Sequence, residues 1–324
     1  MTNQPLLVND FLNYMETIRG KSNNTIVAYG YDLNLFFKFI KIRRNIVPSD
    51  TELDQIYVGD IDEYIIRTIS LSDLYSFLSF AANQRDNKNH ARARKVACLR
   101  SFFKYLQNKA KVIDENPALD MEPPKINSRQ PIYLTLDESK RLLASIDGEN
   151  KDRDYSIITL FLNCGLRLSE LVGIDINRLN GDILTVIGKG NKERTVYLNK
   201  ACLYAINAYL KVRPHDCVKD KNALFLSERK QRISKRTVQY LVKKYIGASD
   251  LDTERYSTHK LRHTAATLMY KYGNVDIRAL QHILGHENIS TTQIYTHVDD
   301  DRLRNAVKAN PLSGEFEDNN IIKD

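Results

Sequence analysis

The sequence predicts a mainly α-helical protein of two domains, the second of which contains a small antiparallel sheet. Three observations support this fold class. Apolar residues recur at helical spacing along about the first 110 residues, whereas residues 114–132 contain four prolines and no periodicity. Further on, helical runs are interrupted by two segments, 183–187 and 194–198, in which apolar and polar residues alternate as in a strand pair.

Composition narrows the class of protein. The chain has 324 residues, enough for two domains, and 42% of them are hydrophobic. It contains no run of about 18 apolar residues, and its start lacks the basic and apolar segments of a signal peptide, so we expect a cytoplasmic protein without membrane contact. The net charge of +8 favours a polyanionic partner, nucleic acid first.

Five helical runs are predicted in the first domain, where apolar positions repeat every three to four residues. They cover residues 7–18, 25–42, 58–68, 72–82 and 88–108. The last run carries a basic face opposite its apolar one, formed by Arg92, Arg94, Lys95, Arg100 and Lys104. Such a face is either simply solvated or laid along a DNA groove with its cations on phosphates.

Several local signals place polar residues in the second domain. Thr135 and Glu138 form a capping box at a helix start, and Gly165 closes a helix over residues 153–163. Arg167 follows in a turn, where an arginine is usually a surface residue. The hairpin between the two strands holds Lys189 between two glycines; it lacks the spacing of a phosphate-binding P-loop and could be a polar loop tip.

A basic cluster lies around a second helix start, at which Ser234 is the expected cap. Cations at a helix N-terminus are well placed to contact phosphates. The predicted contacts are Arg229, Arg232, Lys235 and Arg236. The four cysteines, by contrast, are widely spaced and form no C-x-x-C pair, so we expect them to be reduced and structural.

The stretch from residue 258 to 295 concentrates polar groups at short spacing. His259 and Arg262 share a helix face if Thr258 caps the helix that Gly273 ends. A second helical run, 275–284, stops at a glycine, so that His286 lies just past a helix end.

A third, short helix, capped by one of residues 290–292, is expected to carry Tyr295. His282 and His286 are four residues apart, but a glycine ends the helix between them and no H-E-x-x-H motif occurs, which disfavours a metal pair.

The ordered set H-x-x-R-H, L-G-H and T-x-x-Y-T-H-V resembles the C-terminal signature of the tyrosine recombinases, or phage-type integrases, and most closely their Xer-type branch. The segment G-L-R-x-S-E-L matches the position of the family's first catalytic arginine, and the lysine of G-K-G matches its catalytic lysine. The resemblance implies six catalytic residues. They are Arg167, Lys189, His259, Arg262, His286 and Tyr295.

The resemblance also implies roles for these residues. Tyr295 would attack a DNA phosphorus, the two arginines and His286 would bind the phosphate, and Lys189 would protonate the departing 5′ oxygen. His259 would sit near the tyrosine hydroxyl as base or hydrogen-bond donor, while His263, at a common family position, would either support a catalytic residue or serve packing. Glu170 would be a buried carboxylate that holds Arg167. The bond energy is kept in the tyrosine ester, so no nucleotide cofactor is expected, and the set of residues fits phosphoryl transfer without a metal.

For the domains, the resemblance implies a SAM-like, helical core-binding domain (residues 1–112), a linker (113–132) and a catalytic domain (133–324) that close on double-stranded DNA as a clamp. Recombination of two sites needs four cut strands, so a homotetramer, or a heterotetramer with a related recombinase, is expected on paired sites. A helix over residues 299–309 would dock on a neighbouring protomer. The sequence does not separate chromosome dimer resolution from integration of a mobile element.

Three alternatives stay open from the sequence. A type IB topoisomerase has a similar active site but relaxes supercoils without strand exchange. A DNA-binding protein without catalysis would have no need of Tyr295 at this spacing. A metal-dependent nuclease would lose its activity in EDTA.

Overall fold

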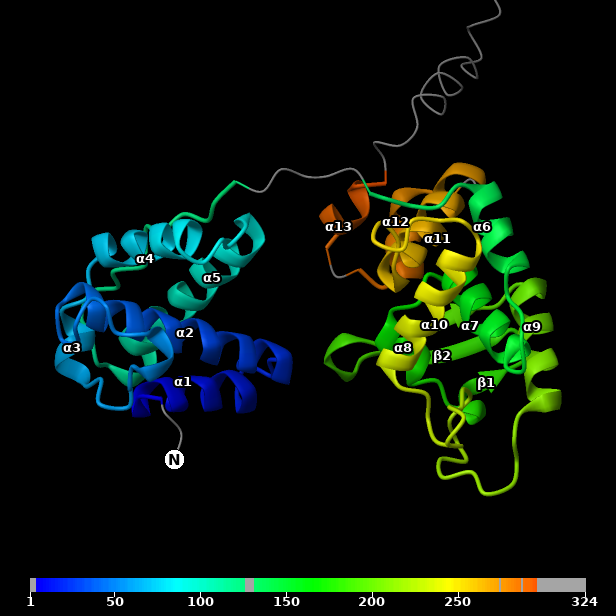
Figure 1. Ribbon diagram of the computed structural model, residues 1–324, viewed down its shortest axis with the longest axis horizontal. Coiled ribbons are helices and arrows are strands. Elements are labelled where there is room, and N and C mark those ends of the chain that lie inside the picture. Colours follow the sequence, from blue (N-terminus) through cyan, green and yellow to red (C-terminus); the bar gives the residue numbers. More distant parts are fainter. Residues whose placement is uncertain (1–3, 126–130, 274, 287, 296–324) are drawn as a thin grey trace, which may run out of the picture. The chain divides into compact units, whose positions relative to one another are not determined.

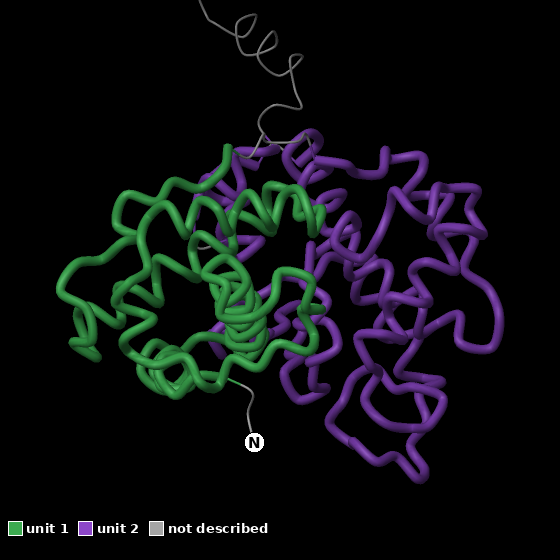
Figure 2. Tube along the Cα trace, turned by 60° about the vertical axis from the view of Figure 1, so that its left-hand side comes forward, with its two compact units in different colours: residues 1–127 green, residues 128–324 purple. Residues whose placement is uncertain are grey.

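The structure is a computed structural model that describes residues 4–125, 131–273, 275–286 and 288–295, except the side chain of Lys189. The chain forms two compact units, Met1–Asn127 and Ser128–Asp324 (Figure 2). The boundary falls inside the segment 113–132 that the prolines mark as a connector. Within the described residues, no helix is long and apolar enough to span a bilayer.

The regular elements in the described part of unit 1 are all helices or helical turns, joined by irregular segments (Figure 1). Its elements are α1 (Leu6–Thr17), α2 (Asn23–Arg43), the 3₁₀ turn η1 (Leu53–Gln55), α3 (Glu63–Arg67), α4 (Leu71–Asn83), α5 (Asn89–Tyr105) and the π turn η2 (Leu106–Ala110). The apolar stripes of these helices meet in a core rich in phenylalanine, in which Phe36 packs edge-on against Phe77 and Phe103. The predicted helical character of this part is confirmed.

Two segments of unit 1 differ from their predicted structure. Of residues 58–68, only Glu63–Arg67 is helical, because the side chain of Asp62 caps the helix there by accepting a hydrogen bond from the Ile65 amide at 3.0 Å. The chain also continues to pack on unit 1 after α5, since Ile113, Ala118 and Met121 belong to its core. The start of the predicted connector is therefore part of the folded unit.

Lys95 does not lie on the exposed basic face of α5. Its side chain is 4% exposed, and its ammonium donates a hydrogen bond to Asp32 of α2 at 2.5 Å. The helical spacing alone could not show this, because the acidic partner lies 63 residues earlier in the chain. Arg94 and Arg100 are exposed on the same helix, and Arg92 is half-buried.

Unit 2 packs helices around a small sheet (Figure 1). The helices are α6 (Leu136–Ala144), α7 (Lys151–Cys164), α8 (Leu168–Val172), α9 (Lys200–Val212), α10 (Lys235–Ala248), α11 (Thr258–Tyr272), α12 (Ile277–Leu284) and α13 (Ser290–Gln293). Helix α7 lies between α9 and α11 and is buried along most of its length. The predicted capping box of α6 is present, with Thr135 and Glu138 each bonding the other's backbone amide.

The sheet is antiparallel in the order β1 (Leu179–Asn180), β2 (Ile183–Ile187) and β3 (Glu193–Tyr197). Leu184 pairs with Val196, and both side chains are buried, whereas their neighbours along the strands point outward. This alternation confirms the predicted strand pair. The hairpin that joins the strands contains the 3₁₀ turn η4 (Lys189–Asn191) and extends toward the ends of α8 and α12.

Candidate active site

Two glycines allow two helix ends to meet. Gly165 ends α7 and Gly285 ends α12, each with a positive φ (59° and 63°) that L-residues rarely adopt. A Cβ atom at Gly165 would come within 2.8 Å of the Leu284 side chain, and one at Gly285 within 2.8 Å of the Arg194 side chain. Larger residues at either position would push apart the segments that carry Arg167 and His286.

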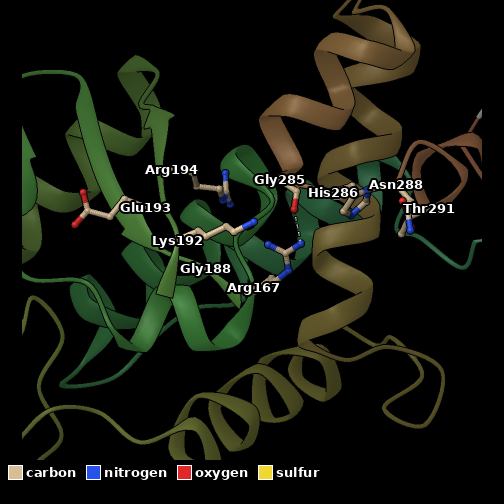
Figure 3. A pocket seen from close by; sticks show the side chains of 9 residues that line it. All are labelled: Arg167, Gly188, Lys192, Glu193, Arg194, Gly285, His286, Asn288 and Thr291. Carbon is tan, nitrogen blue, oxygen red and sulfur yellow. Dashed lines mark hydrogen bonds between the residues drawn. The ribbon is translucent and has the colours of Figure 1, made fainter. Parts of the chain in front are cut away.

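Arg167 is held by a carboxylate and by a backbone carbonyl. Its Nη1 donates to Glu170 Oε1 at 2.8 Å. Its Nη2 donates to the carbonyl oxygen of Gly285 at 2.7 Å, which Figure 3 shows as a dashed line. The Glu170 side chain is fully buried and also accepts a hydrogen bond from Arg194 at 2.8 Å. This arrangement confirms the expectation that Glu170 holds Arg167.

Burial alone would raise the pKa of Glu170, but the hydrogen bonds and charge of Arg194 and Arg167 outweigh burial and lower it. The carboxylate is therefore charged at neutral pH and balances the guanidinium groups around it.

Arg262 joins three segments from the inside. Its side chain is almost fully buried on α11, and its two Nη atoms donate to the carbonyl oxygens of Gly165 at 2.5 Å and Leu284 at 2.6 Å. Burial, followed by the charge of Arg167, lowers the pKa of Arg262 to about 10, so the guanidinium still carries its charge at neutral pH. The helix itself begins one residue earlier than predicted, because its N-cap is Ser257 and Thr258 is its first residue.

The cationic groups border open space. A cavity of 450 Å³ is lined by Arg167, Arg262, His259, His286 and Lys235, among others. An adjoining cavity of 330 Å³ also touches Arg167 and His286, and Figure 3 shows the Lys192 side chain of the hairpin extending toward Arg167 there. Burial and then nearby arginines lower the pKa of His286 to about 4, and burial and then Lys260 lower that of His259. Both rings are accordingly neutral at pH 7.

The tyrosine contact differs from the predicted one. Tyr295 follows α13 instead of lying within it, and its side chain is 1% exposed. Its hydroxyl is hydrogen-bonded to Nδ1 of His263 at 2.7 Å, whereas His259 touches the ring of His263 edge-on with centroids 4.5 Å apart. The position predicted for His259 is thus taken by His263, for which the resemblance implied only a supporting or packing role. The i, i+4 spacing of the two histidines on α11 could have indicated this, because it makes them neighbours on one face of the helix.

The remaining predicted residues fall into three groups. The backbone of Lys189 lies in the hairpin turn, but its side chain lies outside the described residues. Arg232 is bound internally: it pairs with Asp175 at 2.5 Å and Asp220 at 2.8 Å, which accounts for its charge without DNA. Arg229, Lys235 and Arg236 are exposed near the start of α10, whose N-cap is Ser234 as predicted.

Comparison with known proteins agrees with this geometry. The model of the phage integrase family matches residues 133–302, and that of the N-terminal SAM-like domain of phage integrases matches residues 8–65. The chain belongs to the phage integrase family. It is 62% identical to the tyrosine recombinase XerC of Caldanaerobacter subterraneus subsp. tengcongensis over 311 residues. This alignment covers 96% of this chain and 88% of that relative.

Another relative is the tyrosine recombinase XerD of Proteus mirabilis, which is 32% identical. The alignment covers 92% of this chain and 90% of the XerD chain. The fold is shared with XerH bound to its palindromic difH substrate (TM-score 0.71, 22% identity, 93% of this chain and 84% of that one). A lambda integrase dimer bound to a COC′ core site also shares the fold (TM-score 0.63, 16% identity, covering 88% of this chain and 95% of that one). The chain is therefore a Xer-type tyrosine recombinase, and the type IB topoisomerase alternative is not favoured.

Proposed function

We propose that this recombinase cuts and rejoins double-stranded DNA through a 3′-phosphotyrosyl intermediate on Tyr295. The observation that carries the proposal is the cavity shared by Arg167, Arg262, His259 and His286. Tyr295 is linked to its lining by a hydrogen bond to His263, whose ring contacts that of His259. Two guanidinium groups with fixed orientation suit the non-bridging oxygens of a phosphodiester, because each offers a planar pair of donors to charge that grows in the transition state.

The reaction then follows from the residues present. Tyr295 Oη attacks the phosphorus, and the bond to the 5′ oxygen breaks as Lys189 supplies a proton to it. The 5′-hydroxyl of a second strand attacks the tyrosine ester in the reverse sense, which releases Tyr295. Because Tyr295 is 1% exposed, DNA binding must uncover its hydroxyl before attack.

The reaction is proposed to need no metal ion. Arg167 and Arg262 can balance the negative charge of the phosphodiester, which is the charge that a metal ion would otherwise balance. Glu170 and backbone carbonyls fix the orientations of the two guanidinium groups. The described residues also contain no group of three or more histidine, cysteine, aspartate or glutamate side chains suited to hold a metal.

The DNA-binding surface is proposed to include exposed cations of both units. They are Arg94 and Arg100 on α5 and Arg229, Lys235 and Arg236 around the start of α10. Contacts of this kind neutralise backbone phosphates and position the protein without reading sequence.

On paired sites we propose a tetramer, either of this chain alone or with a related recombinase, acting in the cytoplasm on chromosome dimers or on a mobile element. The segment 299–309 expected to join protomers lies outside the described residues.

A plasmid assay tests this function. The target site is first isolated as the chromosomal fragment that the protein retains, and two copies are then placed as direct repeats in a supercoiled plasmid. In buffer with EDTA, we expect two smaller circles with the sequence between the sites excised. Relaxed plasmid of unchanged size would indicate a topoisomerase instead, and loss of all activity in EDTA would contradict metal independence.

A further inference from the structure

Within the part of the chain that the structure describes, His263 is the titratable group hydrogen-bonded to the hydroxyl of Tyr295, the proposed nucleophile. The Nδ1 and Oη atoms are 2.7 Å apart, and the Tyr295 side chain is buried, so water does not compete for the hydroxyl. The two residues lie 32 positions apart in sequence, on α11 and just after α13. The contact is therefore a product of the fold and not of local chain geometry.

Both members of the pair are neutral in the free protein. Burial is the main cause that lowers the pKa of His263 to about 4, followed by electrostatic interaction with His259, Lys260 and Arg262 on its own helix and with His286 beyond α12. At neutral pH only Lys260 and Arg262 of these four carry a charge. Burial raises the pKa of Tyr295 to about 12, partly offset by Arg262. At neutral pH the proton stays on the phenol, and a neutral imidazole nitrogen can accept a hydrogen bond from it.

A bound phosphate changes this balance. The phosphodiester carries a negative charge, and the cavity that would hold it is lined by Arg262, whose positive charge disfavours a proton on His263. An anion at that place offsets the charge of Arg262, and a nearby opposite charge favours the protonated imidazole. His263 is thus a weak base without substrate and a stronger one with it.

We propose that His263 is the proton acceptor for the tyrosine nucleophile and that it becomes basic only when the scissile phosphate is bound. The inference rests on the proposed role of Tyr295. The O–H bond of Tyr295 breaks as its proton moves to Nδ1 of His263 and its oxygen forms a bond to phosphorus. The bond from phosphorus to the 5′ oxygen breaks, and that oxygen takes a proton from Lys189. In rejoining, His263 returns its proton to Oη, and the incoming 5′-hydroxyl gives its proton to Lys189.

The test compares His263→Ala, His263→Asn and, as a matched control, His282→Ala, which removes an exposed histidine of α12 outside this site. Asparagine can place an acceptor oxygen near the position of Nδ1 but cannot hold the proton. The measurement is the single-turnover rate of covalent adduct formation on a nicked suicide substrate with the complex formed beforehand. We expect both His263 variants to be slower by about 100-fold or more, and His282→Ala to match the unchanged protein.

Added imidazoles provide a second readout, independent of how well the alanine variant is packed. The rate of His263→Ala should rise with the basicity of a series of similarly sized imidazoles, as general-base rescue requires. A bridging 5′-phosphorothiolate should leave the His263 defect in place, because that substrate removes only the need to protonate the leaving group.

Three results would overturn the inference. An asparagine variant at full rate would mean that His263 only positions the hydroxyl. A faster alanine variant would mean that His263 holds Tyr295 in a resting state. Rescue that is independent of imidazole basicity would mean cavity filling. In each case an adduct at Tyr295 in the unchanged protein leaves the proposed function standing, whereas no adduct at Tyr295 would remove the proposed function itself.

Discussion

Arg167 donates a hydrogen bond from Nη2 to the carbonyl oxygen of Gly285 at 2.7 Å, across 118 residues of sequence (Figure 3). The contact fixes the end of α12 against the start of α8, so that His286 faces the same cavity as Arg167. Neither segment could build this site alone, because each supplies only part of the phosphate-binding charge. The buried carboxylate of Glu170 orients Arg167 for this contact.

Replacing Glu170 by glutamine should impair both stability and catalysis. The variant keeps the shape of the side chain but leaves the charges of Arg167 and Arg194 without their buried partner. We expect a loss of about 3 kcal/mol in the free energy of unfolding and adduct formation slower by about 10- to 100-fold. Urea unfolding and single-turnover cleavage measure the two effects.

Glu254→Gln is the control for this substitution, because its ion pair with Lys243 is exposed and should contribute little. An unchanged cleavage rate in Glu170→Gln would show that Arg167 is positioned without the carboxylate.

Acidification should destabilise unit 2 through two buried histidines. His263 and His286 have a pKa of about 4 in the folded protein against 6.5 for an unperturbed histidine. Between these values the unfolded chain binds more protons than the folded one, so the free energy of unfolding falls as the pH decreases from about 6.5 to about 4. The pKa of Glu170 is lowered from 4.5, so its own contribution to stability is lost as the pH falls below about 4.5.

Urea midpoints at several pH values would measure this dependence. A variant with asparagine at both histidine positions should show a shallower slope over the same interval. A slope equal to that of the unchanged protein would place the proton uptake elsewhere.

Lys189 and Lys192 allow the general acid to be identified within one hairpin. We expect Lys189→Ala to slow cleavage of the normal 5′-oxygen substrate strongly and to recover on a 5′-thiolate substrate, since a thiolate leaves without a proton. Lys192→Ala removes a cation that borders the Arg167 cavity, so its defect should be the same on both substrates. Thiolate rescue of the Lys192 variant alone would reassign the acid.

Lys95 and Arg100 should respond differently although both lie on α5. Lys95→Ala leaves Asp32 buried with only Arg94 as its ion-pair partner, so we expect a loss of about 3 kcal/mol in the stability of unit 1. Equal thermal stability of the Lys95 variant and the unchanged protein would contradict the buried ion pair.

Arg100 is exposed on the same helix, and its removal should reduce the slope of log affinity for DNA against log salt concentration by about 0.9 if it contacts one phosphate.

Local chemistry made the elements of the fold predictable. Thr135 with Glu138, Ser234, Gly165 and Gly285 act at helix ends through bonds to neighbouring backbone or through a positive φ, and such effects are readable from a few adjacent residues. Alternation in residues 183–187 likewise revealed a strand, because one side of the sheet is buried.

The contacts within the site were harder to predict from the sequence. The partner of Tyr295 depends on how the segment after α13 packs against α11. The burial of Lys95 and the ion pairs of Arg232 depend on acidic residues far away in sequence. Helical spacing places these side chains on a face but does not show what covers that face. Residue types and order therefore indicated the chemistry, and tertiary packing decided which histidine meets the nucleophile.

The most direct test of the account is covalent attachment to a nicked suicide substrate, read on a denaturing gel for the unchanged protein and for Tyr295→Phe. The unchanged protein should form an adduct whose DNA-linked peptide contains Tyr295, in the presence of EDTA. The phenylalanine variant should bind the same DNA with equal affinity and form no adduct, because it lacks only the attacking oxygen. A covalent adduct in the phenylalanine variant, or one mapped to another residue, would contradict the central claim.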